Sequence, residues 1–352
     1  MKKASLDFLK SLVAQPSPSG FEQPVQKVWR QHMKSYADKI WTDVHGNTIA
    51  VLNPKGKPRV MLAGHCDEVG FMVNYINDEG FLYFSAIGGV DPGLVSARRV
   101  KIFTEKGIVY GVVGRKAIHM MDPEERKKVS EMHKLWIDIG AKDKKEAQKL
   151  VSVGDPIVFD YGFQELRNGL AVSRGFDDRV GSFAVAETLR LLAAKKPKAA
   201  VFAVSTVQEE LGLRGARTSA FGIDPHVGIA VDVGNATDHP DADKQKAGEI
   251  KLGLGPVIVR GPNINPVVEK GLMAAARKAK VPFQTLGASR ATGTDANAIQ
   301  INRAGVAAGL VSVPNRYMHT PVEMISLDDL DDTSRILAAF IMSLDARSDF
   351  TP

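Results

Sequence analysis

An α/β fold with an inserted β-rich domain is predicted by three features of this 352-residue sequence. Before residue 69 and after residue 165, apolar runs of strand length alternate with amphipathic segments, which is typical of a mostly parallel sheet covered by helices. Residues 69–165 instead contain short β-like runs separated by Gly, Asp and Asn, which favours a small barrel. Acidic residues and histidines follow several apolar runs. We therefore expect an α/β domain over 1–68 and 166–352, and an inserted β-barrel domain over 69–165.

Each element is predicted from its local pattern. Helices are expected over residues 4–14, 21–37, 179–195, 264–280, 295–304 and 328–345. Strands are expected over residues 47–52, 59–64, 199–207, 227–233, 281–286 and 306–313. Ser19 stands three residues before Glu22, which predicts a capping box at the second helix. Within the insert, the charged segment 122–140 is expected to be helical.

Composition excludes several classes of function. Lys and Arg total 46 and Asp and Glu total 40, so the net charge of +6 is a mild excess, and no nucleic-acid partner is expected. No apolar stretch approaches the roughly 20 residues of a membrane span, and Asp7 and Lys10 interrupt any signal-peptide core. Cys66 is the only cysteine, which rules out an internal disulfide. We expect a cytoplasmic protein without a membrane partner.

The stretch "AGHCDEVGF" places His65 and Asp67 two residues apart. In extended backbone these side chains share a face, and Cys66 points the other way. His65 could then bind a metal ion while Asp67 holds the other ring nitrogen. A single histidine in such a place is also compatible with an ordinary loop residue.

Two further stretches each contain a pair of adjacent carboxylates. Asp177 and Asp178 precede a predicted helix, where they either cap the helix or bridge two cations. Glu209 and Glu210 follow a buried apolar strand. If their side chains diverge, one can ligate a metal ion while the other faces the substrate water; otherwise they are a solvated pair on a loop.

Asp232 and His319 complete the set, because each follows a predicted strand. His319 also precedes a helix for which we expect Ser326 as the cap. Two imidazoles and several carboxylates suit zinc or cobalt, which accept mixed nitrogen and oxygen ligands. Five ligands with one shared carboxylate would fit two ions about 3.5–4 Å apart. The candidate ligands are His65, Asp177, Glu210, Asp232 and His319.

The motifs around these residues, in their order along the chain, resemble those of the tetrahedral (TET) aminopeptidases. These are dinuclear metallopeptidases of the glutamyl and leucyl aminopeptidase type. The motifs are "GHCDEVGF", "FDDRVG", "QEELGLRGA", "DVGNATDHP", "GTDANAI" and "RYMHTPVEM", with "LWIDIGA" and "VSVGDPIVFD" in the insert. The resemblance covers essentially the whole chain. It implies a phosphorylase/hydrolase-like catalytic domain and a PDZ-like or barrel-like insert used for dimer contacts. It also implies a hollow homododecamer.

The resemblance also implies a role for each candidate residue. His65 and Asp232 resemble the ligands of one Zn²⁺ or Co²⁺ ion. Glu210 and His319 resemble the ligands of a second ion, and Asp177 resembles the carboxylate that bridges the two. Glu209 resembles the general base, Asp67 resembles the group that orients His65, and the Asp177–Asp178 bond is expected to be cis. The implied substrates are peptides with a free N-terminus.

Two stretches depart from the usual pattern of the family. "DHPD" stands where a D-x-P-G pattern is common, and Arg290 and Ala291 occupy a usually glycine-rich stretch. Neither departure touches a proposed ligand, but either could alter the substrate pocket. Two alternatives stay open: a glycoside hydrolase that uses Glu209 and Glu210 as its acid pair, or a non-enzymatic scaffold with the same fold. A related deacylase or carboxypeptidase would share the two-metal core. The sequence does not identify the preferred first residue.

Overall fold

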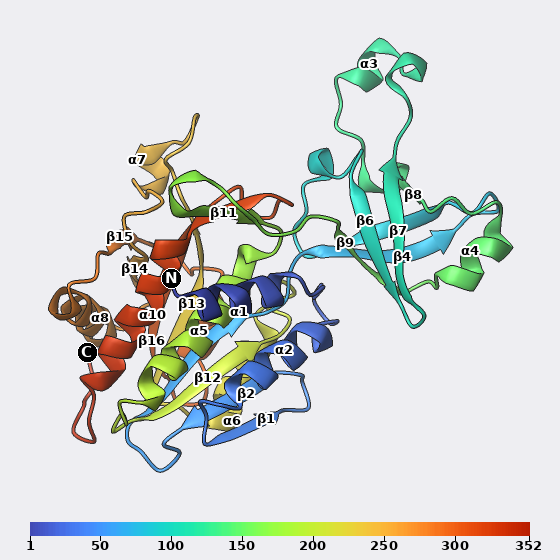
Figure 1. Cartoon of the computed structure of the whole chain (residues 1–352). Coiled ribbons are helices and arrows are strands. Elements are labelled where there is room, and N and C mark those ends of the chain that lie inside the picture. The colour runs from blue at the N-terminus through green and yellow to red at the C-terminus, as the bar shows by residue number, and fades with distance from the viewer. The chain divides into compact units, whose positions relative to one another are not determined.

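The computed structural model describes residues 1–352, and the chain divides into two compact units (Figure 1). The first unit comprises Met1–Asp67, Gly162–Met318 and Val322–Pro352. The second comprises Glu68–Tyr161 together with the short segment His319–Pro321. The predicted fold class is confirmed: the first unit is a sheet covered by helices, and the second contains a closed barrel.

The first unit is built on a mixed sheet of 11 strands in the order β1-β2-β12-β3-β13-β16-β17-β11-β10, with β14 and β15 joined beside β16. Its central strands β12, β3, β13 and β16 run parallel to one another, and antiparallel pairs flank them. The strands are β1 (Lys39–Thr42), β2 (Thr48–Leu52), β3 (Arg59–His65), β10 (Gln164–Glu165), β11 (Leu170–Ser173), β12 (Ala200–Thr206), β13 (Val227–Asn235), β14 (Val257–Arg260), β15 (Gln284–Gly287), β16 (Ala307–Arg316) and β17 (Glu323–Ser326).

Helices cover both faces of this sheet because its central strands are apolar on both sides. In β3, Val60 and Leu62 belong to the large core that includes α1, α2, α5, α8 and α10, whereas Met61 and Ala63 pack with α6 and α9. The helices are α1 (Lys3–Val13), α2 (Gln23–Met33), α5 (Phe176–Ala193), α6 (Arg214–Ile223), α7 (Lys244–Ala247), α8 (Pro266–Ala279), α9 (Asp295–Gln300) and α10 (Leu327–Met342), and Arg167–Gly169 forms a 3₁₀ turn.

The second unit is a closed barrel in the order β4-β5-β8-β7-β6-β9. Its own core is apolar and includes Phe71, Phe84 and Phe159, with the Phe71 ring edge to face against each of the other two. The strands are β4 (Gly70–Ile76), β5 (Leu82–Ile87), β6 (Arg99–Thr104), β7 (Gly107–Gly114), β8 (Trp136–Asp138) and β9 (Pro156–Phe159). Short helices α3 (Pro123–Arg126) and α4 (Lys144–Leu150) and three 3₁₀ turns (Pro92–Leu94, Ile118–Met120, Met132–Lys134) lie between them.

Several sequence expectations about local structure need correction. The capping box at the second helix is wrong: Glu22 is the N-cap without a side-chain cap bond, and the Ser19 hydroxyl donates to Asp67 instead. The charged segment 122–140 is helical only at α3 and a 3₁₀ turn, because Trp136–Asp138 forms β8 and pairs with β5 and β7. By contrast, Ser326 caps α10 as predicted, since its hydroxyl accepts from the Asp329 N–H.

Candidate metal centre

Parallel strands bring the candidate residues to one edge of the sheet. His65 is the last residue of β3, and it lies opposite Thr206 at the end of β12. Asp232 lies near the end of the neighbouring strand β13. Because the carboxyl ends of parallel strands meet at one edge, ligand sites of α/β proteins form there.

His65 is the centre of the cluster. Its Nε2 atom lies 3.2 Å from Asp177 Oδ1, 3.8 Å from Glu209 Oε2 and 3.9 Å from Asp232 Oδ1. The side chain is 2% exposed, so these carboxylates meet the ring in a nearly dry environment. One ring nitrogen therefore faces three carboxylates, and the other is left for a supporting partner.

Asp67 is that supporting partner, and it also anchors the loop that carries the two glutamates. The backbone carbonyl of Asp67 lies 3.1 Å from His65 Nδ1, and its carboxylate Oδ1 lies 3.4 Å from the same nitrogen and accepts from the Glu209 N–H at 3.0 Å. Its Oδ2 accepts from the Glu210 N–H at 3.1 Å and from the Ser19 hydroxyl at 2.6 Å. A carboxylate behind a histidine fixes the orientation and tautomer of the ring. Asp67 thus links the position of His65 to that of both glutamates.

The two aspartates at the start of α5 have different partners. Asp178 is fully buried, and its carboxylate accepts from the backbone N–H groups of His65 and Gly181. Asp177 instead turns a carboxylate oxygen toward His65, while its own N–H donates to Glu323 Oε2 at 2.9 Å. The Asp177–Asp178 peptide bond is cis, as the resemblance implied.

Glu209 and Glu210 lie on the loop between β12 and α6, and their side chains join different groups. Donor atoms of His65, Glu209 and Asp232 all lie within 4.8 Å of one another. Oxygens of Asp177 and Glu210 also lie within 4.8 Å of each other. The start of the loop is fixed by Asn47, whose Oδ1 accepts from the Val207 N–H. The two side chains therefore diverge, which is the arrangement that different roles for the two acids would require; those roles stay a prediction.

The buried carboxylates of the cluster raise one another's pKa values. Burial, together with the charges of Asp232 and Asp295, raises the pKa of Glu209 to about 10 despite the opposing effect of His65. Burial and neighbouring carboxylates also raise the pKa of Asp232 and of Asp178 well above the ordinary value. For His65, burial lowers the pKa, but Glu209, Asp177 and Asp67 outweigh it and raise the pKa well above 6.5.

This donor set fits divalent cations. Buried carboxylates that repel one another need a positive partner, and the cluster offers one imidazole nitrogen and several carboxylate oxygens. Mixed nitrogen and oxygen donors suit zinc and cobalt, whereas magnesium and calcium prefer oxygen alone. The residues of the cluster can therefore hold a metal ion.

His319 belongs to the barrel unit, where its Nδ1 lies 2.9 Å from the Gly89 carbonyl oxygen. The segment His319–Pro321 is flanked by Met318 and Val322, which both belong to the α/β unit. The role of His319 as a metal ligand therefore stays a prediction. His239, in the loop after β13, has its Nδ1 2.8 Å from the Pro240 carbonyl oxygen.

Asp295 is a site residue that sequence reasoning did not single out. It is 2% exposed, its Oδ2 accepts from the Thr206 hydroxyl, and its Oδ1 has no hydrogen-bond partner. Burial raises its pKa to about 6, and its charge acts on Glu209 and Asp232. The signal was present, because the stretch "GTDANAI" contains this acid among small residues. Nothing in the stretch showed that α9 begins beside the metal cluster.

Comparison with known proteins identifies the family. The family model of the M42 glutamyl aminopeptidases matches residues 46–336. The chain belongs to this family. A lysyl aminopeptidase of Pyrococcus furiosus is 37% identical over 349 residues, which cover 98% of this chain and 99% of that protein. The activity of the family is that of a peptidase that acts on N-terminal residues, and this M42 chain is therefore a hydrolase of the aminopeptidase type.

Solved structures of similar proteins agree with the fold over nearly the whole chain. A TET aminopeptidase from a marine sediment archaeon of the Thaumarchaeota has a TM-score of 0.93 at 36% identity, with 97% of each chain covered. The TET1 peptidase of Pyrococcus horikoshii, described as able to assemble into a tetrahedron or a large octahedral shell, has a TM-score of 0.87 at 32% identity, with 97% of this chain and 100% of that chain covered. None of the helices in the present structure has the length and apolar character needed to cross a bilayer.

Proposed function

We propose that this chain is a dinuclear metalloaminopeptidase that releases N-terminal residues from peptides. The observation that carries the proposal is the arrangement around His65, whose Nε2 faces Asp177, Glu209 and Asp232 while Asp67 stands behind Nδ1. Such a cluster fits the chemistry of a hydrolase in the M42 family.

We assign the ligands as the resemblance implied. His65 and Asp232 hold one ion, Glu210 and His319 hold the other, and Asp177 bridges them. The proximity of Asp177 to both His65 and Glu210 supports a bridging position. For His319 the support is its place in the sequence, directly after Met318 of the α/β unit. We propose zinc or cobalt because the donors are mixed nitrogen and oxygen.

Glu209 is proposed as the general base. When bound, the divalent cations supply positive charge that lowers the pKa of a nearby water and polarises the scissile carbonyl. Glu209 accepts the proton of that water and later delivers it to the leaving amine. Glu209 is suited to this role because its side chain is 8% exposed and its backbone is fixed by Asp67. The remaining acids, Asp295 among them, favour a substrate that carries a free α-ammonium group.

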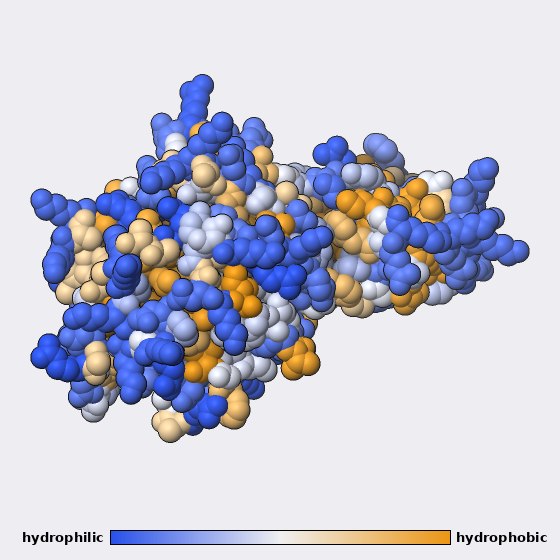
Figure 2. All heavy atoms as spheres, turned by 60° about the horizontal axis from the view of Figure 1, so that its bottom comes forward, coloured by the Kyte–Doolittle hydropathy of each residue, from blue (hydrophilic) through white to orange (hydrophobic).

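Assembly through the barrel unit is also part of the proposal. Ile108, Tyr110 and Val112 alternate along β7 and are 48%, 62% and 51% exposed. Figure 2 shows such apolar side chains at the surface of the barrel unit. An apolar strip of this kind on a strand is suited to contact a second copy. We propose that it forms the dimer contact of a larger homo-oligomer such as a dodecamer, in the manner implied by the resemblance. A cytoplasmic location is proposed from the single cysteine.

The proposal is tested by hydrolysis of a panel of aminoacyl-fluorophore substrates, each supplied free and N-acetylated. The enzyme is assayed before and after chelation, with Zn²⁺ or Co²⁺ added back. We expect cleavage of the free-amine substrates alone, lost on chelation and restored by metal. The panel also identifies the preferred first residue. Cleavage of the acetylated substrates, or activity that survives complete removal of metal, would contradict the proposal.

The general base is tested by Glu209→Gln. We expect kcat to fall by about 10²–10⁴-fold, which is the usual contribution of a positioned acid–base group. Metal content and Tm should stay near those of the wild type, because the amide keeps the shape of the side chain. A variant that keeps wild-type kcat would show that another group takes the proton.

A further inference from the structure

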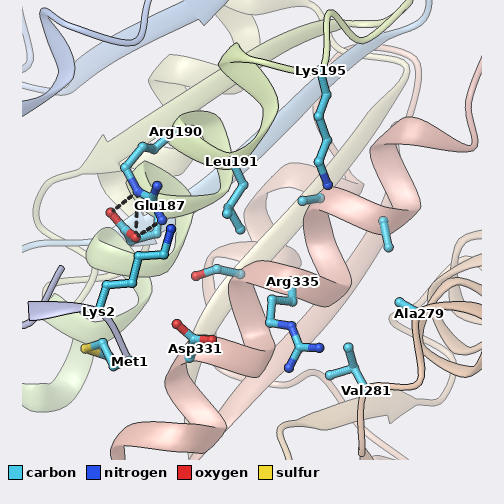
Figure 3. Close-up of a pocket in the computed structure, with 13 residues that line it drawn as sticks. Met1, Lys2, Glu187, Arg190, Leu191, Lys195, Ala279, Val281, Asp331 and Arg335 are labelled. Atoms are coloured by element: carbon cyan, nitrogen blue, oxygen red, sulfur yellow. Dashed lines mark hydrogen bonds and ion pairs between the residues drawn. The ribbon is translucent and has the colours of Figure 1, made fainter. Parts of the chain in front are cut away.

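A pocket lies in the α/β unit, and none of its lining residues belongs to the candidate metal centre. It has a volume of about 420 Å³ and is lined by the second half of α5, by α10, by the end of α8 and by the N-terminal segment (Figure 3). Glu187 at its wall is 10 residues after Asp177 along α5, which corresponds to roughly 15 Å of helix. Small-molecule sites begin at about 300 Å³, so the volume admits a small organic ligand.

One wall of this pocket is formed by an ion pair, Glu187 with Arg190, in which each charge already has its partner. Glu187 is 3% exposed, and its carboxylate accepts from Arg190 Nε (Figure 3). It also accepts from the Ser5 hydroxyl. Burial raises the pKa of Glu187, but the His32 ring 3.7 Å away and the hydrogen bonds from Arg190 and Ser5 outweigh burial and lower the pKa to about 2. Glu187 therefore stays ionised and neutralises Arg190, and neither charge needs a ligand.

The other charges of the pocket leave an excess of positive charge. Lys2 and Lys195 line the pocket, and neither side chain has an acid within ion-pair distance. Arg335 also lines it and pairs with Asp332 through one of its nitrogens at 2.5 Å. Among these side chains, Lys2, Lys195 and Arg335 are three cations against two acids, Asp331 and Asp332, which leaves one side-chain positive charge in excess. Figure 3 shows the Lys195 side chain extending toward α10, where Arg335 and Asp331 lie.

Apart from Ser334, the rest of the lining consists of apolar side chains. Leu191, Val281 and Ala338 belong to it, and they come from α5, from the segment after α8 and from α10 respectively. An apolar wall with unpaired ammonium groups beside it matches a molecule that has an apolar body and one negative group. A zwitterion or a cation of the same length would bring positive charge to the lysines and be repelled.

We propose that this pocket binds a small organic acid with an apolar body, a medium-chain monocarboxylate being the representative ligand. The carboxylate pairs with Lys195, Lys2 adds positive charge on another side of the pocket, and the hydrocarbon chain lies on the wall of Leu191, Val281 and Ala338. This binding does not depend on peptide hydrolysis, so it is tested by direct binding rather than by activity.

The experiment is isothermal calorimetry on the metal-loaded protein with four probes: hexanoate, norleucine, hexylamine and acetate. We expect hexanoate to bind at least about tenfold more tightly than each of the others. Norleucine matches hexanoate in length but adds an ammonium group, and acetate keeps the charge but lacks the chain. Hexylamine that bound as tightly as hexanoate, or no hexanoate binding up to about 10 mM, would overturn the proposal.

Substitutions in the pocket test whether hexanoate binds there or at the metal centre. The double substitution Lys2→Glu and Lys195→Glu changes exposed side chains and should weaken hexanoate binding at least about tenfold. The matched control is Lys270→Glu on the exposed face of α8, which is outside the pocket and should leave the affinity within about twofold. Hexanoate binding that is unchanged in the double variant would assign it to another site and overturn the proposal.

Discussion

At the scale of single residues, Asp67 carries the most connections in the site, because one carboxylate orients His65 and holds the backbone of both glutamates. We expect Asp67→Asn to lower kcat/KM and metal affinity by about 10–100-fold, which is typical when a group behind a metal ligand is lost. The amide has the same size, but its nitrogen cannot accept a hydrogen bond. Steady-state kinetics and metal analysis after dialysis measure both effects.

Ser19→Ala is the matched control for that substitution. It removes only the hydroxyl that donates to Asp67 and leaves the contacts of Asp67 with His65 and the glutamates in place. Its effect should be several-fold smaller than that of Asp67→Asn. Equal effects of the two substitutions would mean that the hydroxyl, rather than the carboxylate's other contacts, sets the geometry of the site.

The sequence predicted which residues belong to the site where a charged residue or histidine follows the end of an apolar strand. His65, Asp67 and Asp232 follow apolar runs, so their meeting at one edge of the sheet follows from parallel topology. Glu323 and Asp295 were missed because their partners are remote in sequence: Glu323 accepts from the Asp177 N–H, and Asp295 from Thr206. Ser19 was assigned to a cap for the same reason, since local spacing does not reveal a partner 48 residues away.

At the scale of elements, helix α5 can approach strand β3 closely because two glycines meet. A Cβ atom on Gly64 would lie 2.5 Å from the Gly181 carbonyl oxygen. Gly64→Ala would therefore push α5 away from β3 and separate the Asp178 carboxylate from the His65 N–H that donates to it. We expect a loss of about 1–3 kcal/mol in the free energy of unfolding, as is usual for overpacking, and weaker metal binding. Denaturant unfolding and metal titration give the two values.

Gly222→Ala in α6 is the contrasting control. A Cβ atom there would have no neighbour within 4 Å, and the residue is exposed in a helix. The substitution should stabilise the protein by about 0.4–1 kcal/mol, because alanine loses less backbone entropy on folding than glycine. If both alanine variants were neutral, close packing of α5 on β3 would not be what positions Asp178.

Most elements with a strong apolar pattern were predicted correctly, although the apolar strand β14 was missed. The central strands and the long helices α5, α8 and α10 were found within a few residues. Helix α6 was missed because its sequence "RGARTSAFGI" contains two glycines, a threonine and a serine, all weak helix formers. Its packing against α9 and the sheet supplies the stability that its own sequence lacks.

At the scale of the whole molecule, assembly should depend on the apolar strip of β7. Tyr110→Glu places a charge in the centre of that strip and should shift the protein to smaller species while its Tm changes little. Size-exclusion chromatography with light scattering gives the mass. Val44→Glu is the control, since Val44 is an exposed apolar residue on a loop of the α/β unit. An unchanged mass for Tyr110→Glu would place the contact between copies elsewhere.

Thermal stability of the whole molecule should depend on metal and pH together. In the absence of cations the pKa of Glu209 is raised from 4.5 to about 10, so the folded state binds more protons than the unfolded state between these values. Stability of the chelated protein therefore falls as pH rises through this window. Asp232, whose pKa is also raised, acts in the same direction.

Without cations, the folded state favours the protonated carboxyl groups. Bound cations reverse this preference, because they favour the ionised carboxylates and bind the folded state. The difference in Tm between metal-loaded and chelated protein should accordingly widen from about pH 5 to about pH 9, within the window set by the pKa of Glu209. Differential scanning fluorimetry over this range measures it. Glu209→Gln removes the largest titrating acid and should flatten the pH dependence of the chelated protein. If the Tm difference between metal-loaded and chelated protein narrowed with rising pH, the metal would not be bound by this cluster of carboxylates.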